Sequence, residues 1–142
     1  MTRTAGGVGF GVSMKPRLLD LFCGAGGCSV GYHRAGFEVV GVDIKPQPRY
    51  PFTFIQGDAL ETLKSIGERF DVIHASPPCQ GYSISRNNGC HKDAPLLIGD
   101  SRERLVETGK PFVIENVIGA PLHNLPLFGF FCRHSLWSKL WT

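Results

Sequence analysis

Short apolar segments alternate with segments of helical pattern along most of this 142-residue chain. The apolar segments are brief and rich in Val, Ile, Leu and Phe, which is typical of strands in a buried sheet; they cover residues 17–22, 37–42, 53–55, 71–75 and 111–114. Helices are predicted over residues 28–35, 60–66 and 97–108. Strands that alternate with helices predict an α/β fold, in which helices cover both faces of a mostly parallel sheet.

Length, charge and cysteine content narrow the class of protein. The chain is long enough for one domain with a core of its own. Its net charge of +3 is compatible with nucleic-acid binding but is not evidence for it. No apolar run reaches the length of a membrane span and no signal peptide is visible, so no membrane partner is expected. Five cysteines without a disulfide spacing predict a reduced, cytoplasmic setting.

A glycine-rich turn follows the first predicted strand, at residues 24–27 (Gly-Ala-Gly-Gly). Such a turn lets a ligand approach backbone N–H groups, although many glycine turns bind nothing. Asp43 ends the second strand and Asp58 follows the third, where carboxylates suit the ribose and adenine amino group of a nucleoside. A nicotinamide dinucleotide would use the same acid, but Ser29 occupies the position of its third glycine. The chain has no Walker loop, which disfavours nucleoside triphosphate hydrolysis.

Residues 76–80 (Ser-Pro-Pro-Cys-Gln) follow the fourth predicted strand. The two prolines end the strand and fix the backbone. They hold Cys79 at the carboxyl end of a parallel strand, where open α/β sheets carry their chemistry. Taken alone, the pattern is equally consistent with an inert cysteine in a turn.

These segments together resemble the DNA (cytosine-5)-methyltransferases. Residues 20–27 are similar to the motif of that family that holds S-adenosylmethionine, and residues 76–80 to its nucleophile motif. Residues 115–117 (Glu-Asn-Val) are similar to the motif that carries an essential glutamate. Residues 33–37 resemble compact phage and actinobacterial members. The resemblance implies a Rossmann-like, S-adenosylmethionine-dependent methyltransferase sheet.

The resemblance also implies a reaction, in which a methyl group passes from S-adenosylmethionine to C5 of a cytosine flipped out of double-stranded DNA. Cys79 would add to C6 and Glu115 would act at N3. The implied cofactor contacts are Asp20, Phe22, Gly24, Ala25, Gly26, Gly27, Asp43, Ile44, Asp58, Ala59 and Pro77. The implied DNA contacts are Pro78, Gln80, Ser83, Arg86, Asn116 and Val117. A role in restriction-modification follows from the same resemblance.

The other cysteines and histidines are predicted to have no chemical role. Cys23 is expected to pack inside the glycine turn, and no function is assigned to Cys28, Cys90 or Cys132. Neither Cys23 with Cys28 nor Cys90 with His91 shows the paired spacing of a structural zinc site, so no metal is predicted. The histidines lack a visible carboxylate or thiol partner and are expected to be structural or solvent-facing: His33, His74 and His91.

The C-terminal part departs from the family. Members continue with an arginine-rich strand, a target-recognition region and a closing motif, and residues 133–137 match the first of these only weakly. The predicted organisation is a flexible tail over residues 1–14, a catalytic domain over 15–120 and an atypical aromatic segment over 121–142. The last strands are predicted to be missing, atypical or supplied by a second polypeptide.

Two functional hypotheses stay open at this point. The first is an active methyltransferase, compact or completed by a second chain, and the second is an inactive remnant that at most binds S-adenosylmethionine. A methyltransferase acting on exocyclic amino groups fits less well, because such enzymes carry an aromatic residue after Pro-Pro, where this chain has Cys79.

Overall fold

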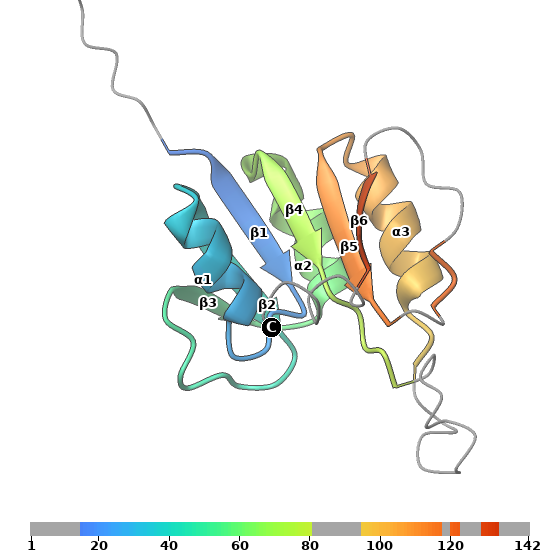
Figure 1. The fold of residues 1–142 in the computed structure, drawn as a ribbon, viewed down its shortest axis with the longest axis horizontal. Helices are drawn as coiled ribbons and strands as arrows, with labels where there is room; N and C mark the ends of the chain where they lie inside the picture. The colour runs from blue at the N-terminus through green and yellow to red at the C-terminus, as the bar shows by residue number, and fades with distance from the viewer. Residues whose placement is uncertain (1–14, 81–94, 118–119, 123–128, 134–142) are drawn as a thin grey trace, which may run out of the picture.

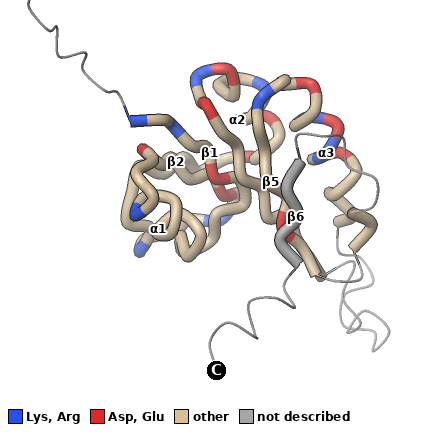
Figure 2. Tube along the Cα trace, turned by 45° about the horizontal axis from the view of Figure 1, so that its top comes forward, with Lys and Arg blue, Asp and Glu red and all other residues tan. Residues whose placement is uncertain are grey.

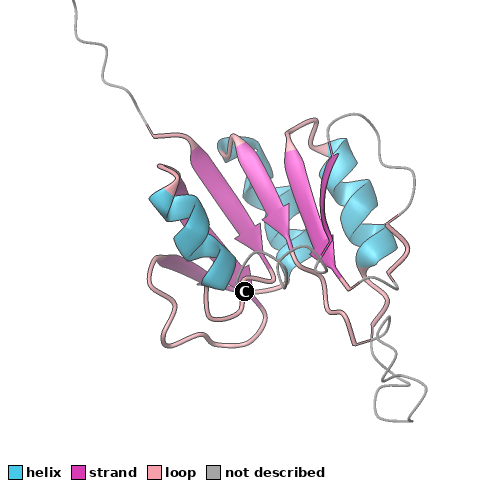
Figure 3. Cartoon of the chain, in the orientation of Figure 1, coloured by secondary structure: helices cyan, strands magenta, loops and turns pink. Residues whose placement is uncertain are grey.

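The computed structural model describes residues 15–80, 95–117, 120–122 and 129–133, which form one sheet with helices packed against it (Figures 1 and 3). This confirms the predicted α/β class, and the predicted elements lie within about two residues of the observed ones. In chain order the elements are β1 (Arg17–Leu21), α1 (Gly27–Arg34), β2 (Glu38–Asp43), β3 (Thr53–Gln56), α2 (Ala59–Ile66), the 3-10 turn η1 (Gly67–Arg69), β4 (Val72–Ala75), α3 (Ile98–Glu107), β5 (Phe112–Asn116) and β6 (Gly129–Arg133).

The strand order across the sheet is β3-β2-β1-β4-β5-β6, and every neighbouring pair is parallel. The chain runs outward from β1 to β3 and then crosses back to β4, on the other side of β1. This reversal is a topological switch point, and ligands of open α/β sheets bind outside the carboxyl ends of the strands there. The glycine turn after β1 and the Pro-Pro-Cys loop after β4 both lie at this point.

Helices cover both faces of the sheet, as right-handed crossovers on the two sides of β1 require. α1 lies on one face, while α2 and α3 lie beside each other on the other (Figure 1). Consecutive strand residues such as Leu18 and Leu19 point to opposite faces, and both are fully buried. Each fully buried Leu or Ile contributes about 1.5–3 kcal/mol from removal of apolar surface from water. The core therefore holds the ends of β1 and β4 in fixed positions.

β6 is an element that the sequence analysis did not predict. It pairs with β5 in parallel register, from Phe112 with Gly129 to Asn116 with Arg133. The last strands were predicted to be missing, atypical or supplied by a second polypeptide, and β6 is one strand of this chain beyond the fifth. The segment is short and its pairing is long-range, so no local periodicity marks it. The predicted tail and most of the aromatic segment lie outside the described residues, and the predicted domain limits stay predictions.

Among the helices that the structure describes, none is long and apolar enough to cross a membrane.

Candidate functional site

The turn between β1 and α1 is built from left-handed backbone. Phe22, Gly24 and Gly26 have φ values of 58°, 51° and 91°. Glycine adopts this region at little cost, whereas Phe22 is an uncommon non-glycine case. An added Cβ at Gly24 or Gly27 would meet nothing within 4 Å, so open space adjoins the turn. At Gly26 it would lie 3.0 Å from the ring of Tyr50, so this glycine is required by packing.

Asp43 joins the end of β2 to the glycine turn. Its Oδ2 accepts a hydrogen bond from the Gly24 N–H at 3.0 Å, and its Oδ1 accepts one from the Lys45 N–H at 2.9 Å. A carboxylate has about four acceptor positions, so both oxygens can still accept a ribose hydroxyl. Ile44, the next predicted contact, is 68% exposed beside it.

Asp58 caps the N-terminus of α2. Its Oδ1 accepts hydrogen bonds from the Leu60 and Glu61 N–H groups, both at 2.9 Å. An aspartate at this position stabilises a helix by about 1 kcal/mol, so the residue has a structural role whatever it binds. Ala59, which follows it, is buried under the helix start and offers no exposed side chain.

Asp20 does not face the open side of the turn. Its side chain is 1% exposed, and its Oδ1 lies 2.8 Å from His74 Nδ1. Its Oδ2 accepts a hydrogen bond from the Ser29 hydroxyl, which is itself 2.7 Å from the Tyr50 hydroxyl. The predicted direct contact between this carboxylate and a cofactor is therefore corrected: Asp20 supports the site from beneath.

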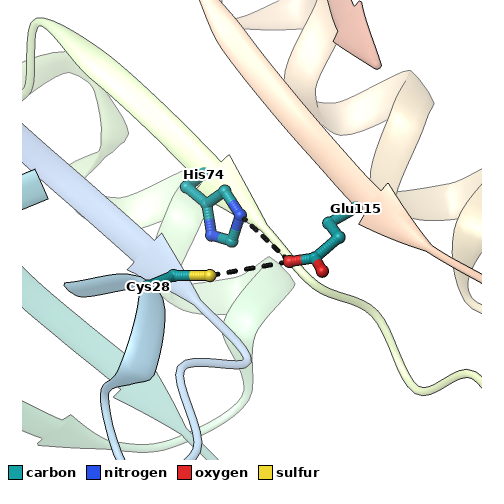
Figure 4. A group of neighbouring side chains, drawn as sticks. All are labelled: Cys28, His74 and Glu115. Carbon is teal, nitrogen blue, oxygen red and sulfur yellow. Dashed lines mark hydrogen bonds and ion pairs between the residues drawn. The ribbon is translucent and has the colours of Figure 1, made fainter. Parts of the chain in front are cut away.

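His74 was predicted to be structural or solvent-facing; it is buried, and it has carboxylate neighbours that were not visible in the sequence. Asp20 and His74 are directly paired across β1 and β4. His74 Nε2 lies 3.8 Å from Glu115 Oε2, on the far side of the ring (Figure 4). The register between strands that are far apart in sequence set this contact, and spacing along the chain gave no sign of it.

The Pro-Pro-Cys loop and the end of β5 line one cavity of about 360 Å³. Cys79 is half-buried there and Glu115 also lines the cavity, so the structure brings the two predicted catalytic residues to one space. The complete lining is Ser76, Pro77, Pro78, Cys79, Gln80, Glu115, Asn116 and Val117. Ser83 and Arg86 lie outside the described residues.

Asn116 fixes the loop through its side-chain amide. Its side chain is buried, and its Nδ2 donates to the carbonyl oxygen of Pro77 at 2.8 Å. Its Oδ1 accepts from the Val117 N–H at 3.0 Å. Asn116 therefore has a positioning role in the loop, and its predicted contact with DNA stays a prediction.

Glu115 is held at the mouth of the cavity, with 24% of its side chain exposed. Its Oε2 lies 3.4 Å from the Ser76 hydroxyl and 3.5 Å from Cys28 Sγ, both of which can donate to it. Cys28, which was expected to have no role, thus borders the site. The ligand atoms of Cys28, His74 and Glu115 all lie within 4.8 Å of one another, so the cluster has the composition of a possible cation site.

Burial changes the acidity of two groups beneath the turn. It raises the pKa of the Cys23 thiol to about 12, with the charges of Asp20 and Asp43 adding to the effect. Burial likewise raises the pKa of Tyr50. Both groups therefore stay protonated at neutral pH, and Cys23 has the inert character predicted for it.

The helices α2 and α3 offer no basic face. Along α2 and α3, Lys and Arg alternate with Asp and Glu (Figure 2). Phosphate contacts usually need clustered Lys and Arg.

Comparison with known proteins gives a family match over most of the chain. A family model described as C-5 cytosine-specific DNA methylase matches residues 16–125. The Type II methyltransferase M.XorII of Xanthomonas oryzae pv. oryzae is 35% identical over 123 residues, covering 74% of this chain and 29% of the relative. The Type II methyltransferase M.AquIA of Picosynechococcus sp. is 32% identical over 126 residues, covering 75% of this chain and 50% of the relative.

The chain spans between 28% and 50% of the length of four such relatives. Among solved structures, the PbgP3 protein from Burkholderia pseudomallei has a TM-score of 0.50 at 16% identity, covering 72% of this chain and 35% of that one. This likeness concerns the α/β fold alone. The family model covers well over half of the sequence, and the chain therefore belongs to the C-5 cytosine-specific DNA methylase family.

Proposed function

We propose that this chain forms the cofactor and nucleophile portion of a DNA (cytosine-5)-methyltransferase. The observation that carries the proposal is the cavity at the topological switch point, which Cys79 and Glu115 both line. The family's methyl donor is S-adenosylmethionine, which supplies an electrophilic methyl sulfonium when bound.

The residues around the glycine turn fit such a nucleoside cofactor. Open space adjoins Gly24 and Gly27, where a side chain would intrude. Asp43 retains acceptor capacity for ribose hydroxyls, and the exposed Ile44 offers an apolar surface for a purine ring. Asp58 uses only Oδ1 in the recorded cap bonds, which leaves Oδ2 for an exocyclic amine. These residues would orient the methyl group toward the neighbouring cavity.

Cys79 would act as the nucleophile. Cytosine C5 is a poor nucleophile, and addition of the Cys79 thiolate to C6 makes C5 electron-rich. Glu115 would donate a proton to N3 as the new S–C bond forms, so that no free charge builds up on the ring. C5 would then take the methyl group, whose bonding electron pair stays on the sulfur of the departing S-adenosylhomocysteine, and the C5 proton would pass to a water molecule acting as the base. Elimination of Cys79 and return of the N3 proton to Glu115 restore the starting state.

The DNA partner follows from this chemistry. A cytosine inside a duplex cannot reach the cavity, so it must be flipped out at a cost of a few kcal/mol. Pro78, Gln80 and Val117 line the cavity and are the described candidates for contacts with that nucleotide. Contacts by Ser83 and Arg86, a second polypeptide, a restriction-modification role and a cytoplasmic location stay predictions.

Methyl transfer to DNA tests the proposal. The protein is incubated with S-adenosylmethionine carrying a tritiated methyl group and with duplex DNA of mixed sequence, and the DNA is digested to nucleosides. The expected product is labelled 5-methylcytosine, and none should form with Cys79→Ala. Retained cofactor with unlabelled DNA would identify the inactive remnant. Label on N4 of cytosine or N6 of adenine would identify the exocyclic reaction.

A further inference from the structure

We propose that Cys28, His74 and Glu115 bind a Zn²⁺ ion, and that the bound ion inhibits methyl transfer by keeping Glu115 from cytosine N3. The three side chains come from α1, β4 and β5 and point toward one another (Figure 4). Glu115 also lines the cavity that contains Cys79. Binding of the ion is independent of the proposed function. Its effect on methyl transfer rests on that function, in which Glu115 acts at N3.

The three donors favour zinc over the common hard cations. The cluster offers one sulfur, one imidazole nitrogen and one carboxylate oxygen. Zn²⁺ binds all three kinds of donor, whereas Mg²⁺ and Ca²⁺ take oxygen ligands almost alone. Three protein ligands also leave the fourth position of a tetrahedral ion for water.

The ligand atoms are already close to the spacing that zinc requires. Glu115 Oε2 lies 3.5 Å from Cys28 Sγ and 3.8 Å from His74 Nε2, and all three atoms lie within 4.8 Å of one another. Around a tetrahedral Zn²⁺ with bonds of about 2.0–2.3 Å, neighbouring ligand atoms are about 3.3–3.7 Å apart. Cys28 is exposed in the first turn of α1, so its side chain can rotate to complete the site.

The imidazole is oriented for a metal by a residue outside the ligand set. The His74 side chain is 3% exposed, and its Nδ1 lies 2.8 Å from Asp20 Oδ1. A carboxylate only accepts, so the hydrogen of this bond is on Nδ1 and the lone pair of the neutral ring is on Nε2, toward Glu115. Metal-binding histidines usually have such a carboxylate behind them. This contact is a second observation that points to a cation.

The backbone that carries the ligands is rigid. β4 and β5 are paired, with His74 opposite Val113 and Ala75 opposite Ile114, so the sheet sets where Glu115 begins. Sites on strands and helices are held more precisely than sites on loops. Spacing along the chain gave no sign of this site, because its ligands are far apart in sequence.

Binding of the ion changes what Glu115 can do. Zn²⁺ takes lone pairs from Sγ, Nε2 and Oε2, the proton of the Cys28 thiol passes to water, and no group is oxidised or reduced. The Glu115 oxygen bound to the ion no longer carries a proton to N3. Addition of Cys79 to the ring then lacks its acid, so methyl transfer stops until the ion leaves.

Cobalt(II) tests the site without DNA or methyl transfer. The full chain is stripped of metal with EDTA, kept reduced, transferred to buffer without chelator and titrated with Co²⁺, which absorbs light in the same nitrogen and sulfur sites. The expected signal is a near-ultraviolet charge-transfer band from the Cys28 thiolate, and Zn²⁺ should displace the Co²⁺ and remove it. The absence of this band, or a band that Zn²⁺ leaves in place, would overturn the proposal.

Variants identify the ligands in the same titration. Cys28→Ser should abolish the band, whereas Cys79→Ser, which removes the thiol of the cavity, should keep it. Asp20→Asn should weaken Co²⁺ binding by about 10–100-fold, because the carboxylate behind the imidazole is lost. Melting temperatures show that each variant is folded. A band that survives Cys28→Ser, or an unchanged affinity in folded Asp20→Asn, would overturn the proposal.

Methyl transfer to duplex DNA tests the inhibition. The EDTA-treated chain is assayed with and without Zn²⁺ at the concentration that displaces Co²⁺. Zn²⁺ should lower the rate at least about 10²-fold, and EDTA should restore it. Cys28→Ser should keep the metal-free rate and lose the sensitivity to Zn²⁺.

The outcomes of this assay are distinct. Equal inhibition of both proteins would place the effect of Zn²⁺ elsewhere, and a rate that Zn²⁺ raises would show a catalytic ion; either result overturns the inhibition. Absence of methyl transfer under every condition would refute the proposed function, and the cobalt spectra would still decide whether the site exists.

Discussion

Asp20 and Asp43 are two acids at the ends of neighbouring strands, and their surroundings give them different tasks. Asp20 is buried under the glycine turn and bonded to Ser29 and His74. Asp43 holds the same turn from its rim through Gly24 and keeps acceptor capacity toward the open side. The resemblance groups both as cofactor contacts, and only their burial separates the supporting Asp20 from Asp43, for which cofactor binding stays a prediction.

The cofactor role of Asp43 predicts a selective loss of affinity. Asp43→Ala removes a candidate ribose acceptor and the bond that orders Gly24, so the Kd for S-adenosylmethionine should rise at least about tenfold. Isothermal titration calorimetry measures this. Asp71→Ala is the matched control, because Asp71 also accepts a backbone bond, from the Arg17 N–H at 2.7 Å, but at the opposite end of the sheet. Equal affinities in the two variants would refute the assignment.

Because burial raises the pKa of the Cys23 thiol, we expect Cys23 to be alkylated slowly near neutral pH. Its pKa is raised from 9.0 to about 12, so at pH 8 its thiolate fraction is about 10³-fold below that of an ordinary thiol. Iodoacetamide with peptide mass spectrometry should therefore modify exposed Cys28 long before Cys23. The folded chain holds the Cys23 proton more tightly than the unfolded chain does. The contribution of this thiol to the free energy of unfolding is therefore complete below pH 9 and declines as pH rises toward 12. Equal modification rates at pH 8 would contradict the account.

At the scale of the elements, the βα alternation and the ends of the strands that carry the motifs could be predicted from the sequence. Period and turn residues act locally, so β1, β2 and β4 could be predicted from them. Pairing is long-range: the contact of Asp20 with His74 depends on the register of β1 with β4, and β6 depends on an edge offered by β5. Those features were missed because no local pattern specifies them.

Substitution of Gly41 in β2 by a larger residue is expected to disturb the packing of Tyr50. A Cβ at this position would overlap the ring of Tyr50, which is packed edge-on against Phe52 and bonded to Ser29. Gly41→Ala should therefore lower the free energy of unfolding by about 1–3 kcal/mol, measured by urea denaturation. Gly31→Ala in α1 is the control, since its Cβ would meet nothing within 4 Å, and it should be neutral or stabilising by up to about 1 kcal/mol. Equal effects would contradict this packing.

For the whole molecule, the topology explains why three motifs that are distant in sequence share one region. The strand order reverses between β1 and β4, so the loops after these strands open beside each other. β5 is next in the sheet and brings Glu115 to the same end. The described chain thus combines a nucleoside-type turn and a thiol cavity in a segment that spans no more than half the length of the relatives compared.

Because β6 lies at the edge of the sheet, its removal is expected to change how the chain self-associates. A chain ending at residue 122 would leave the outer edge of β5 unpaired, and unpaired edges recruit other strands. It should melt at a lower temperature and sediment as larger species than the full chain. A chain ending at residue 133, which keeps β6, is the control and should behave like the parent in this respect. Identical sedimentation of both truncated chains would contradict the role of β6.

The site of covalent attachment tests the central claim most directly. The protein is reacted with S-adenosylmethionine and duplex DNA containing 5-fluorocytosine, which blocks release of the enzyme, and the complex is digested and mapped by mass spectrometry. The account predicts one nucleotide bonded to the peptide that contains Cys79, and none in Cys79→Ala. Attachment at another cysteine, an adduct that survives Cys79→Ala, or no adduct in the parent protein would contradict it.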